Sequence, residues 1–159
     1  MIISNHVKIS GVLGLGVYAC TSEFVPSVAC FLGGWLIDID HLLDWVMNFG
    51  PTPNYTRVKD NFARNRVRYV YVIFHGWEYP IGILTFHAFY GLPQWVVYAT
   101  VGYICHLTLD QMFNCHKGFL TYFLTYRILH KFKASSILVR QPGTAPVYTK
   151  NTAMRADEH

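Results

Sequence analysis

Acidic and imidazole side chains interrupt the apolar segments of this chain, and they occur in pairs at helical spacing. Three such pairs are present: Asp38 with His41, His75 with Glu78, and His106 with Asp110. Residues three or four positions apart lie on one face of a helix, so each pair can direct two side chains at one point. Ionisable groups at membrane depth are costly and by default mark a functional site. The pattern therefore predicts apolar helices that enclose a polar site.

The chain contains four apolar segments, at about 2–24, 25–49, 68–92 and 93–113. Each segment has roughly the 20 residues that a helix needs to cross a hydrocarbon core of about 30 Å. Of the 159 residues, 52% are hydrophobic and only 14% are charged, whereas soluble domains have about 25% charged residues. We therefore expect an all-α, polytopic membrane protein with a four-helix transmembrane bundle. Pro80 is expected to kink the third helix just after Glu78.

The basic residues indicate how these segments are oriented. Most of them lie in the connection 50–67 and in the region after the fourth segment, whereas the short connections 23–26 and 91–94 contain no Lys or Arg. The positive-inside rule then places both termini and the long connection in the cytosol, as in a multi-pass protein of the inner (cytoplasmic) membrane. Because the basic residues adjoin apolar segments, the net charge of +4 is a topology signal and does not indicate nucleic-acid binding.

This topology places the polar pairs near one face of the membrane. Each pair lies within about 11 residues of the cytosolic end of its segment, which at about 1.5 Å per residue is roughly 15 Å from that face. His6 lies near the cytosolic start of the first segment. Random placement would scatter these side chains over both leaflets, so their common depth favours a single site.

The candidate ligands in this site are imidazoles and carboxylates, which suit zinc, iron or manganese. They are His6, Asp38, Asp40, His41, His75, Glu78, His106 and Asp110. One tetrahedral ion needs only four ligands, so we expect two or three divalent ions, with zinc preferred. Such ions clamp a phosphate ester and lower the pKa of bound water to about 7. Asp40 and Asp110 are the candidate catalytic residues, Asp40 as a ligand or as the general base.

The region after the fourth segment has a different composition. Residues 117–133 interleave aromatic with basic side chains, which predicts an amphipathic interfacial helix that binds anionic lipid. Residues 135–159 are polar, and from Gln141 onward the composition is typical of a disordered tail. We therefore divide the chain into a metal-site bundle with its interfacial helix, 1–134, and a tail, 135–159.

Four elements of the sequence together form a known pattern. They are His6, Asp38-Ile39-Asp40-His41, His75-Gly76-Trp77-Glu78 and Gly102-Tyr103-Ile104-Cys105-His106-Leu107-Thr108-Leu109-Asp110. In these elements, which span about 1–111, the chain resembles the membrane-bound metal-dependent hydrolases, small inner-membrane proteins of bacteria and archaea. The resemblance implies a metal-dependent hydrolase. A more distant resemblance, at the level of fold, is to zinc-dependent phospholipase C, an all-helical enzyme with a trinuclear zinc site.

The chain departs from the family pattern at two positions. Ile37 stands where the family often has Pro before the Asp-x-Asp-His element. His75 is followed by Gly-Trp-Glu-Tyr, where the family often has Arg-Gly-Phe-Thr-His. The second His of that motif is therefore missing, and Glu78 is the candidate that supplies its ligand.

These features predict an integral membrane enzyme that hydrolyses a phosphoester in a lipid or lipid-linked substrate through metal-activated water. Three alternatives use the same residues. A metal transporter needs a polar path to the far side, and the distal halves of the first and fourth segments offer few polar residues. A di-iron oxidase typically has Glu-x-x-His pairs, which this chain lacks. In a non-catalytic membrane scaffold, His–carboxylate hydrogen bonds would hold the helices together without metal.

Overall fold

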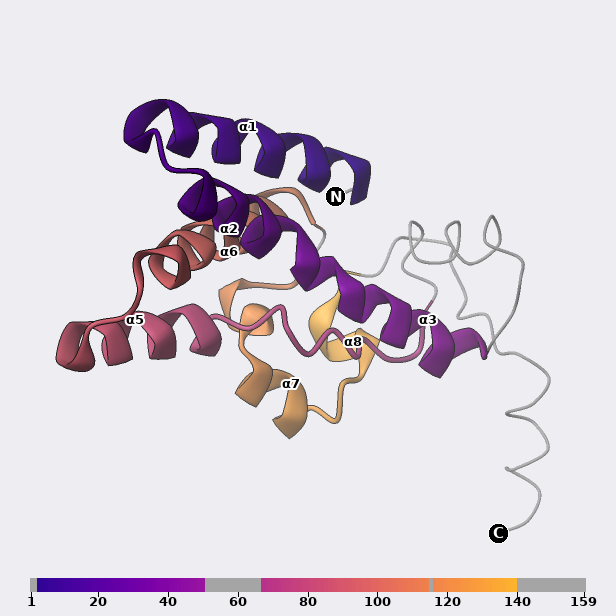
Figure 1. The fold of residues 1–159 in the computed structure, drawn as a ribbon. Helices are drawn as coiled ribbons and strands as arrows, with labels where there is room; N and C mark the ends of the chain where they lie inside the picture. The colour runs from indigo at the N-terminus through magenta and orange to yellow at the C-terminus, as the bar shows by residue number, and fades with distance from the viewer. Residues whose placement is uncertain (1–2, 51–66, 115, 140–159) are drawn as a thin grey trace, which may run out of the picture.

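Helices account for the regular structure of the described residues (Figure 1). The computed structural model describes residues 3–50, 67–114 and 116–139. The elements are α1 (Ile3–Thr21), α2 (Phe24–Trp35), the 3-10 turn η1 (Leu36–Ile39), α3 (Asp40–Phe49), α5 (Glu78–Tyr90), α6 (Gln94–Phe113), the 3-10 turn η2 (Phe119–Tyr122), α7 (Leu124–Leu129) and α8 (Ala134–Ile137). Within these described ranges β-structure is limited to isolated bridges, so the all-α prediction is confirmed for them.

The second predicted segment forms one long helical rod. α2, η1 and α3 follow one another directly, and Figure 1 shows them as a continuous run across the molecule. In the described part of the chain, the rod Phe24–Phe49 is the one helix that is long and apolar enough to cross a membrane. Its tighter 3-10 turn contains Asp38, and such a turn inside a helix often marks a functional position.

α1, α2 and α6 pack closely because small residues line their contacts. A Cβ atom on Gly33 of α2 would lie 2.1 Å from the carbonyl oxygen of Ala99 in α6. A Cβ atom on Gly102 of α6 would lie 2.0 Å from the carbonyl oxygen of Cys30 in α2. No side chain larger than hydrogen fits at either glycine, which is how helices approach closely within membranes. This packing brings the helical rod that carries Asp38 against α6.

The prediction of a helix through 68–92 is wrong in its first part. Residues 67–77 contain no helix, and α5 begins only at Glu78. Pro80 consequently lies in the first turn of α5. Backbone N–H groups of a first turn have no partner within the helix, so the missing N–H of proline costs no hydrogen bond there, and the predicted kink does not arise. With 13 residues, α5 is about 20 Å long, shorter than a hydrocarbon core of about 30 Å. The four-helix transmembrane bundle therefore stays a prediction.

A row of polar side chains on α3 holds the non-helical segment 67–77 in place. Asp40, Asp44 and Asn48 are spaced four residues apart, so they lie on one face of the helix. The backbone N–H of Tyr71 donates to Asp44 at 2.5 Å, and that of Tyr69 donates to Asn48 at 3.2 Å. Asp40 accepts from the same segment nearer to its end. Because these acceptors replace the hydrogen bonds of a helix, the segment can run alongside α3 without forming one.

The prediction of one amphipathic helix through 117–133 is also wrong. The region forms η2 and α7 as separate short pieces, and the positive φ angles of Lys131 (53°) and Phe132 (55°) end the second. Arg127, expected to face anionic lipid, is fully buried. Its Nε donates to the carbonyl oxygen of Thr121 at 2.7 Å, and its Nη1 donates to that of Val72. Arg127 therefore ties α7 to the segment 67–77.

The boundary of the predicted tail lies too early in the chain. Ile137 in α8 is completely buried in a hydrophobic cluster with Val67, Val70, Val72 and Ala134. Residues 135–139 therefore belong to the fold, because they cover the segment that follows the long connection. The rest of the predicted tail, 140–159, and most of the basic connection, 51–66, lie outside the described residues.

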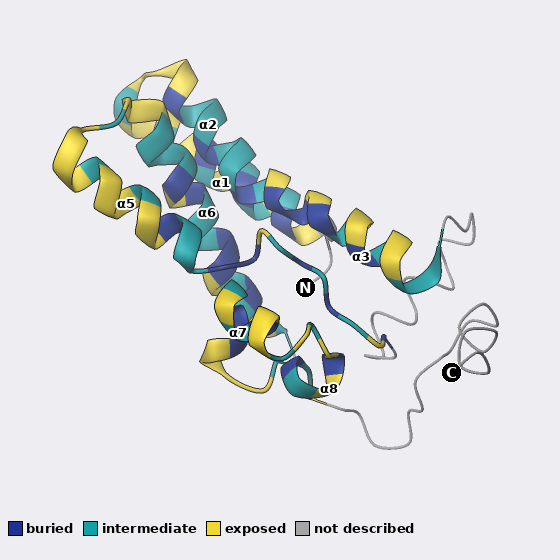
Figure 2. Ribbon diagram, turned by 90° about the horizontal axis from the view of Figure 1, so that it is seen from below, coloured by how far each residue is buried: buried dark blue, intermediate teal, exposed yellow. Residues whose placement is uncertain are grey.

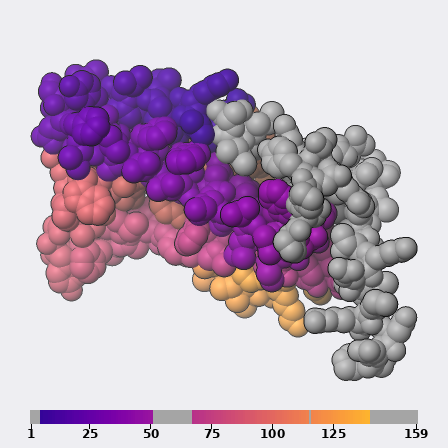
Figure 3. All heavy atoms as spheres, turned by 45° about the vertical axis from the view of Figure 1, so that its right-hand side comes forward, coloured from indigo at the N-terminus to yellow at the C-terminus, as the bar shows by residue number. Residues whose placement is uncertain are grey.

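The interior of the described part is unusually polar. It contains eleven buried polar or charged residues and nine buried hydrophobic ones. Large apolar side chains lie on the outside instead, such as Phe24 (73% exposed) and Phe89 (79% exposed). Figure 2 shows exposed residues along most of α5, and in α3 it shows exposed residues on one side and buried residues on the other. In Figure 3 the N-terminal helices, in indigo and purple, form the upper part of this face, and the segments after residue 67, in pink to orange, lie below them.

Candidate metal centre

Seven of the eight predicted ligands come together in the interior, from four different parts of the fold. They are His6 of α1, Asp38 of η1, Asp40 and His41 of α3, His75 of the segment 67–77, and His106 and Asp110 of α6. All except His41 are buried, and six of the seven are at most 7% exposed. The predicted convergence of these side chains is therefore present in the structure.

Four ligand atoms form the centre of this cluster. The Nε2 atom of His75 lies 3.1 Å from Nε2 of His106, 3.5 Å from Oδ1 of Asp38 and 3.4 Å from Oδ2 of Asp110. The Nε2 atom of His106 lies 3.5 Å from Oδ1 of Asp38 and 3.6 Å from Oδ2 of Asp110. Ligands at about 2.1 Å around a tetrahedral zinc ion lie about 3.4 Å apart. The five separations therefore match the edges of a tetrahedral metal site.

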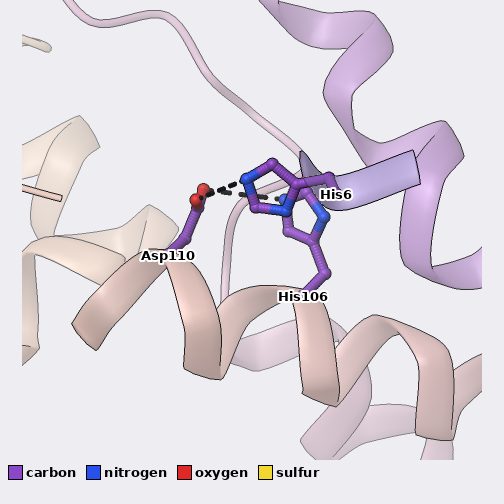
Figure 4. A group of neighbouring side chains, drawn as sticks. All are labelled: His6, His106 and Asp110. Atoms are coloured by element: carbon purple, nitrogen blue, oxygen red, sulfur yellow. Dashed lines mark ion pairs between the residues drawn. The ribbon is translucent and has the colours of Figure 1, made fainter. Parts of the chain in front are cut away.

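Two further imidazoles extend the centre. Nε2 of His6 lies 2.9 Å from Oδ1 of Asp110, and its ring stacks on His106 with 4.1 Å between centroids (Figure 4). Nε2 of His41 lies 3.5 Å from Oδ1 of Asp38. The cluster thus contains two groups that could each hold a metal ion, one of His6, His106 and Asp110 and one of Asp38, His41 and His75.

The tautomers of the two central imidazoles follow from their outer nitrogens. Nδ1 of His106 lies 2.8 Å from the carbonyl oxygen of Gly34, and Nδ1 of His75 lies 3.1 Å from Oδ2 of Asp40. Both oxygens only accept, so each Nδ1 carries a proton, and each neutral ring has a lone pair on Nε2. These two lone pairs lie 3.1 Å apart. They repel each other unless a cation lies between them or one ring gains a second proton.

The buried carboxylates of the cluster also favour a cation, which a metal ion or a protonated imidazole can supply. Asp38 and Asp110 are both buried, and a buried carboxylate is stable only when it is paired or coordinated. Neither oxygen of Asp38 has a hydrogen-bond partner among the described residues, and its nearest imidazole nitrogens are 3.5 Å away. A divalent ion held by Asp38, His75, His106 and Asp110 would neutralise both carboxylates and would give Asp38 closer contacts than the 3.5 Å to its imidazoles. The residues present therefore fit a metal ion.

Asp40 occupies a position behind His75 rather than at the centre. Its Oδ2 accepts from the backbone N–H of Phe74 at 2.8 Å and from Nδ1 of His75 at 3.1 Å. In metal sites a carboxylate at the outer nitrogen of an imidazole ligand fixes the tautomer and the orientation of the ring. The geometry assigns Asp40 this positioning function, whereas the sequence predicted a ligand or a general base.

Glu78 is the predicted ligand that the structure does not bring into the cluster. Its Oε2 accepts from the backbone N–H of Leu124 at 2.9 Å, and its Oε1 accepts from the N–H and hydroxyl of Thr125 at 2.8 Å each. Both oxygens are thus used at the start of α7. The prediction assumed that His75 and Glu78 share one helical face, but the helix begins at Glu78 and His75 precedes it.

Supporting residues that the sequence analysis missed hold His75 in place. The hydroxyl of Tyr103 donates to the carbonyl oxygen of Phe74. The indole Nε1 of Trp77 donates to Gln111 at 2.9 Å. The segment around His75 is thus fixed to α6 on both sides of the imidazole. The spacing of Asp40, Asp44 and Asn48 is a sequence signal for a polar face, but no local signal identifies the partners on α6.

Comparison of the chain with protein-family models, with curated proteins and with solved structures found no match. The chemistry of the site is therefore inferred from its geometry. Almost fully buried imidazoles and carboxylates surround a centre, and their atoms are spaced like the ligands of a tetrahedrally coordinated metal ion.

Proposed function

We propose that this protein is an integral membrane metal-dependent hydrolase that acts on a phosphoester in a lipid or lipid-linked substrate. The observation that carries the proposal is the set of central separations, between 3.1 and 3.6 Å, among two imidazole nitrogens and two carboxylate oxygens. The carboxylate of Asp38, which has no hydrogen-bond partner among the described residues, and the two facing lone pairs of His75 and His106 support a cation at this place. The two groups of ligand atoms support two ions, for which zinc is the preferred metal.

The distribution of polar and apolar side chains supports a membrane environment. A polar interior with large apolar side chains outside is the reverse of a soluble domain, where charged residues are almost never fully buried and large exposed apolar patches are rare. The rod Phe24–Phe49 has the length and composition of a membrane-spanning helix. α1 and α6, with 19 and 20 residues, also have the length of a hydrocarbon core of about 30 Å, but among the described helices only the rod is apolar enough as well.

The protein residues around the centre have separate tasks in this proposal. Divalent ions bound there would supply Lewis-acid activation of water and of a phosphoryl oxygen. Asp38 and Asp110 provide the negative charge that holds the ions, and Asp40 keeps a proton on Nδ1 of His75, so that its Nε2 is available for coordination. The side chain of His41 is 39% exposed, whereas that of Asp38 is 5% exposed. A substrate therefore reaches the centre from the side of His41.

The enzymatic part of the proposal is tested by hydrolysis of phosphoesters by the detergent-purified protein. Phosphatidic acid and a soluble aryl phosphate serve as probes, with zinc or manganese added and then removed by a chelator. We expect phosphate release that chelation abolishes, and no release by His106→Gln or Asp110→Asn, because each variant removes a central ligand atom. Metal-bound protein that hydrolyses neither probe would contradict the hydrolase.

Glu78→Gln is the matched control for these variants. The sequence predicts Glu78 as a ligand, but its oxygens contact Leu124 and Thr125 instead. We expect this variant to retain its metal and its turnover. Loss of metal from Glu78→Gln with an unchanged circular dichroism spectrum would show that the ligand set differs from the one that the geometry assigns. Absence of metal from the wild-type chain would instead favour a scaffold held together by His–carboxylate hydrogen bonds.

A further inference from the structure

An apolar groove of about 400 Å³ lies between α2, α5 and α6. One end is lined by Ile37 and Tyr103. Ile37 precedes Asp38 in the chain, and Tyr103 lies one turn before His106 on α6. The residues at this end of the groove are therefore close in the chain to Asp38 and His106 of the metal centre.

The other end of the groove lies further along the same two helices. There it is lined by Ala29 of α2 and by Trp95 and Val96 of α6. Ala29 precedes Asp38 by nine positions in the chain, a distance of about 13 Å along a helix. Since α2 and α6 pack side by side, the groove follows both helices away from the centre.

The wall of the groove offers little to a polar ligand. Most of its lining side chains are aliphatic. The hydroxyl of Thr100 donates to the carbonyl oxygen of Val96 at 2.8 Å, and the hydroxyl of Tyr103 donates to that of Phe74. Both hydroxyl donors in the wall are therefore used within the protein. An occupant of this groove gains contacts by apolar burial, which favours a chain of methylene groups over a sugar, a peptide or a nucleotide.

We propose that this groove holds the alkyl chain of an amphiphilic substrate, with its phosphoester headgroup at the metal centre. The position of the headgroup rests on the proposed function, whereas the alkyl site stands on the shape and composition of the groove. The substrate class is thus a phosphoester with a long apolar chain. The end of that chain lies beside Ala29, Trp95 and Val96.

The test is photo-crosslinking with a phosphatidic acid that carries a diazirine at the end of one acyl chain. The full-length protein is labelled in detergent, digested, and the labelled peptides are mapped by mass spectrometry. We expect labelling concentrated on the peptides that contain Ala29 and Trp95–Val96. Unlabelled phosphatidic acid should compete, whereas glycerol 3-phosphate, which has no alkyl chain, should not. Labelling spread evenly over the exposed faces of α1, α3 and α5 would overturn the proposal, since it indicates only surrounding lipid.

Two variants that block the far end of the groove sharpen this test. Ala29→Trp and Val96→Trp each place a large ring there and should abolish the labelling of the groove. Val25→Trp is the matched control, because Val25 lies on the same helix as Ala29, is 61% exposed and does not line the groove. Size-exclusion chromatography shows whether each blocking variant is folded. If one of the two misfolds, the other, on a different helix, still gives the result. Unchanged labelling in a folded blocking variant would refute the alkyl site.

The crosslinking result and the hydrolysis result test the alkyl site and the hydrolase activity separately. Crosslinking requires no turnover, so a protein that binds no metal but labels in the groove would refute the metal centre and leave the alkyl site in place. Metal-dependent hydrolysis of the soluble aryl phosphate without labelling in the groove would support the enzyme and refute the alkyl site.

Discussion

Removal of the carboxylate behind His75 should weaken metal binding without removing a ligand. The same oxygen of Asp40 accepts from the backbone N–H of Phe74 at 2.8 Å and from Nδ1 of His75 at 3.1 Å. In Asp40→Asn the amide oxygen can accept both hydrogen bonds, so this variant removes the negative charge and keeps the two contacts of Oδ2. In Asp40→Ala both hydrogen bonds are lost, and the imidazole of His75 is free to rotate.

The two variants should differ in magnitude. Changes to groups that orient metal ligands typically weaken metal affinity by about 10- to 100-fold. We expect Asp40→Asn to be near the lower value, because its geometry is preserved, and Asp40→Ala near the upper value. The alanine variant also removes the partly buried hydrogen bond from the N–H of Phe74, and a typical hydrogen bond contributes about 0.5–1.5 kcal/mol to stability. Its thermal unfolding temperature should therefore fall, whereas that of Asp40→Asn should change little.

Competitive titration of zinc against a chromophoric chelator measures both affinities in detergent, and circular dichroism measures the unfolding temperatures. The number of ions bound per chain should stay the same in both variants, because Asp40 is not a central ligand. Wild-type affinity in Asp40→Ala would refute the positioning function of Asp40. Loss of one whole equivalent in Asp40→Asn would show that Asp40 is itself a ligand.

Three further predictions follow from the packing around the site. Gly33→Ala would place a Cβ 2.1 Å from the carbonyl oxygen of Ala99, so α2 and α6 must separate. This separation should lower the stability by about 1–3 kcal/mol and should reduce metal binding. In the control Gly82→Ala the added Cβ meets nothing within 4 Å, so stability and metal binding should be unchanged. Arg127→Met should lower the unfolding temperature and increase proteolysis around the segment 67–77, because it removes the donors to Thr121 and Val72; wild-type proteolysis would contradict this. Burial and the charge of Arg127 lower the pKa of His116 to about 3. Between about pH 6.5 and 3 the imidazole of His116 therefore binds a proton in the unfolded chain but not in the folded chain. The stability of the folded state should consequently fall as the pH decreases through that range. Chemical denaturation at several pH values measures this loss, which His116→Gln should reduce.

The convergence of the cluster could be predicted from the sequence. Polar pairs at helical spacing, each near the same end of an apolar segment, indicate one site when the segments pack together. His106 and Asp110 lie on one helix, as expected, and His6 joins them from α1. The prediction succeeded here because these residues lie on helices that continue through the apolar segments of the sequence.

Glu78 and the third helix could not be predicted in the same way. An apolar run is consistent with a helix, but the segment 67–77 is held in a non-helical conformation by Asp44 and Asn48, which are more than 20 positions away in the chain. Local propensity contains no information about such partners. Once His75 precedes the helix that Glu78 begins, their spacing no longer places them on one face.

The prediction of an interfacial helix in the C-terminal region failed for a related reason. Aromatic residues interleaved with basic ones are typical of an interfacial helix. Whether an arginine is buried instead depends on carbonyl partners from other parts of the fold, which the local sequence does not show. Arg127 finds one of these at Val72, 55 positions earlier in the chain. Charge patterning therefore predicted a surface where the fold has an interior contact.

The central claim is that the cluster holds metal ions, and elemental analysis of the detergent-purified chain tests it most directly. The measurement is made on protein as purified and again after reconstitution with zinc, iron or manganese, and is normalised per chain. The proposal predicts two equivalents, one for each group of ligand atoms, and in His106→Gln the loss of the equivalent held by His6, His106 and Asp110. No metal above background in the wild-type protein after reconstitution would contradict the metal centre, and the polar interior would then be a network of protonated imidazoles and carboxylates.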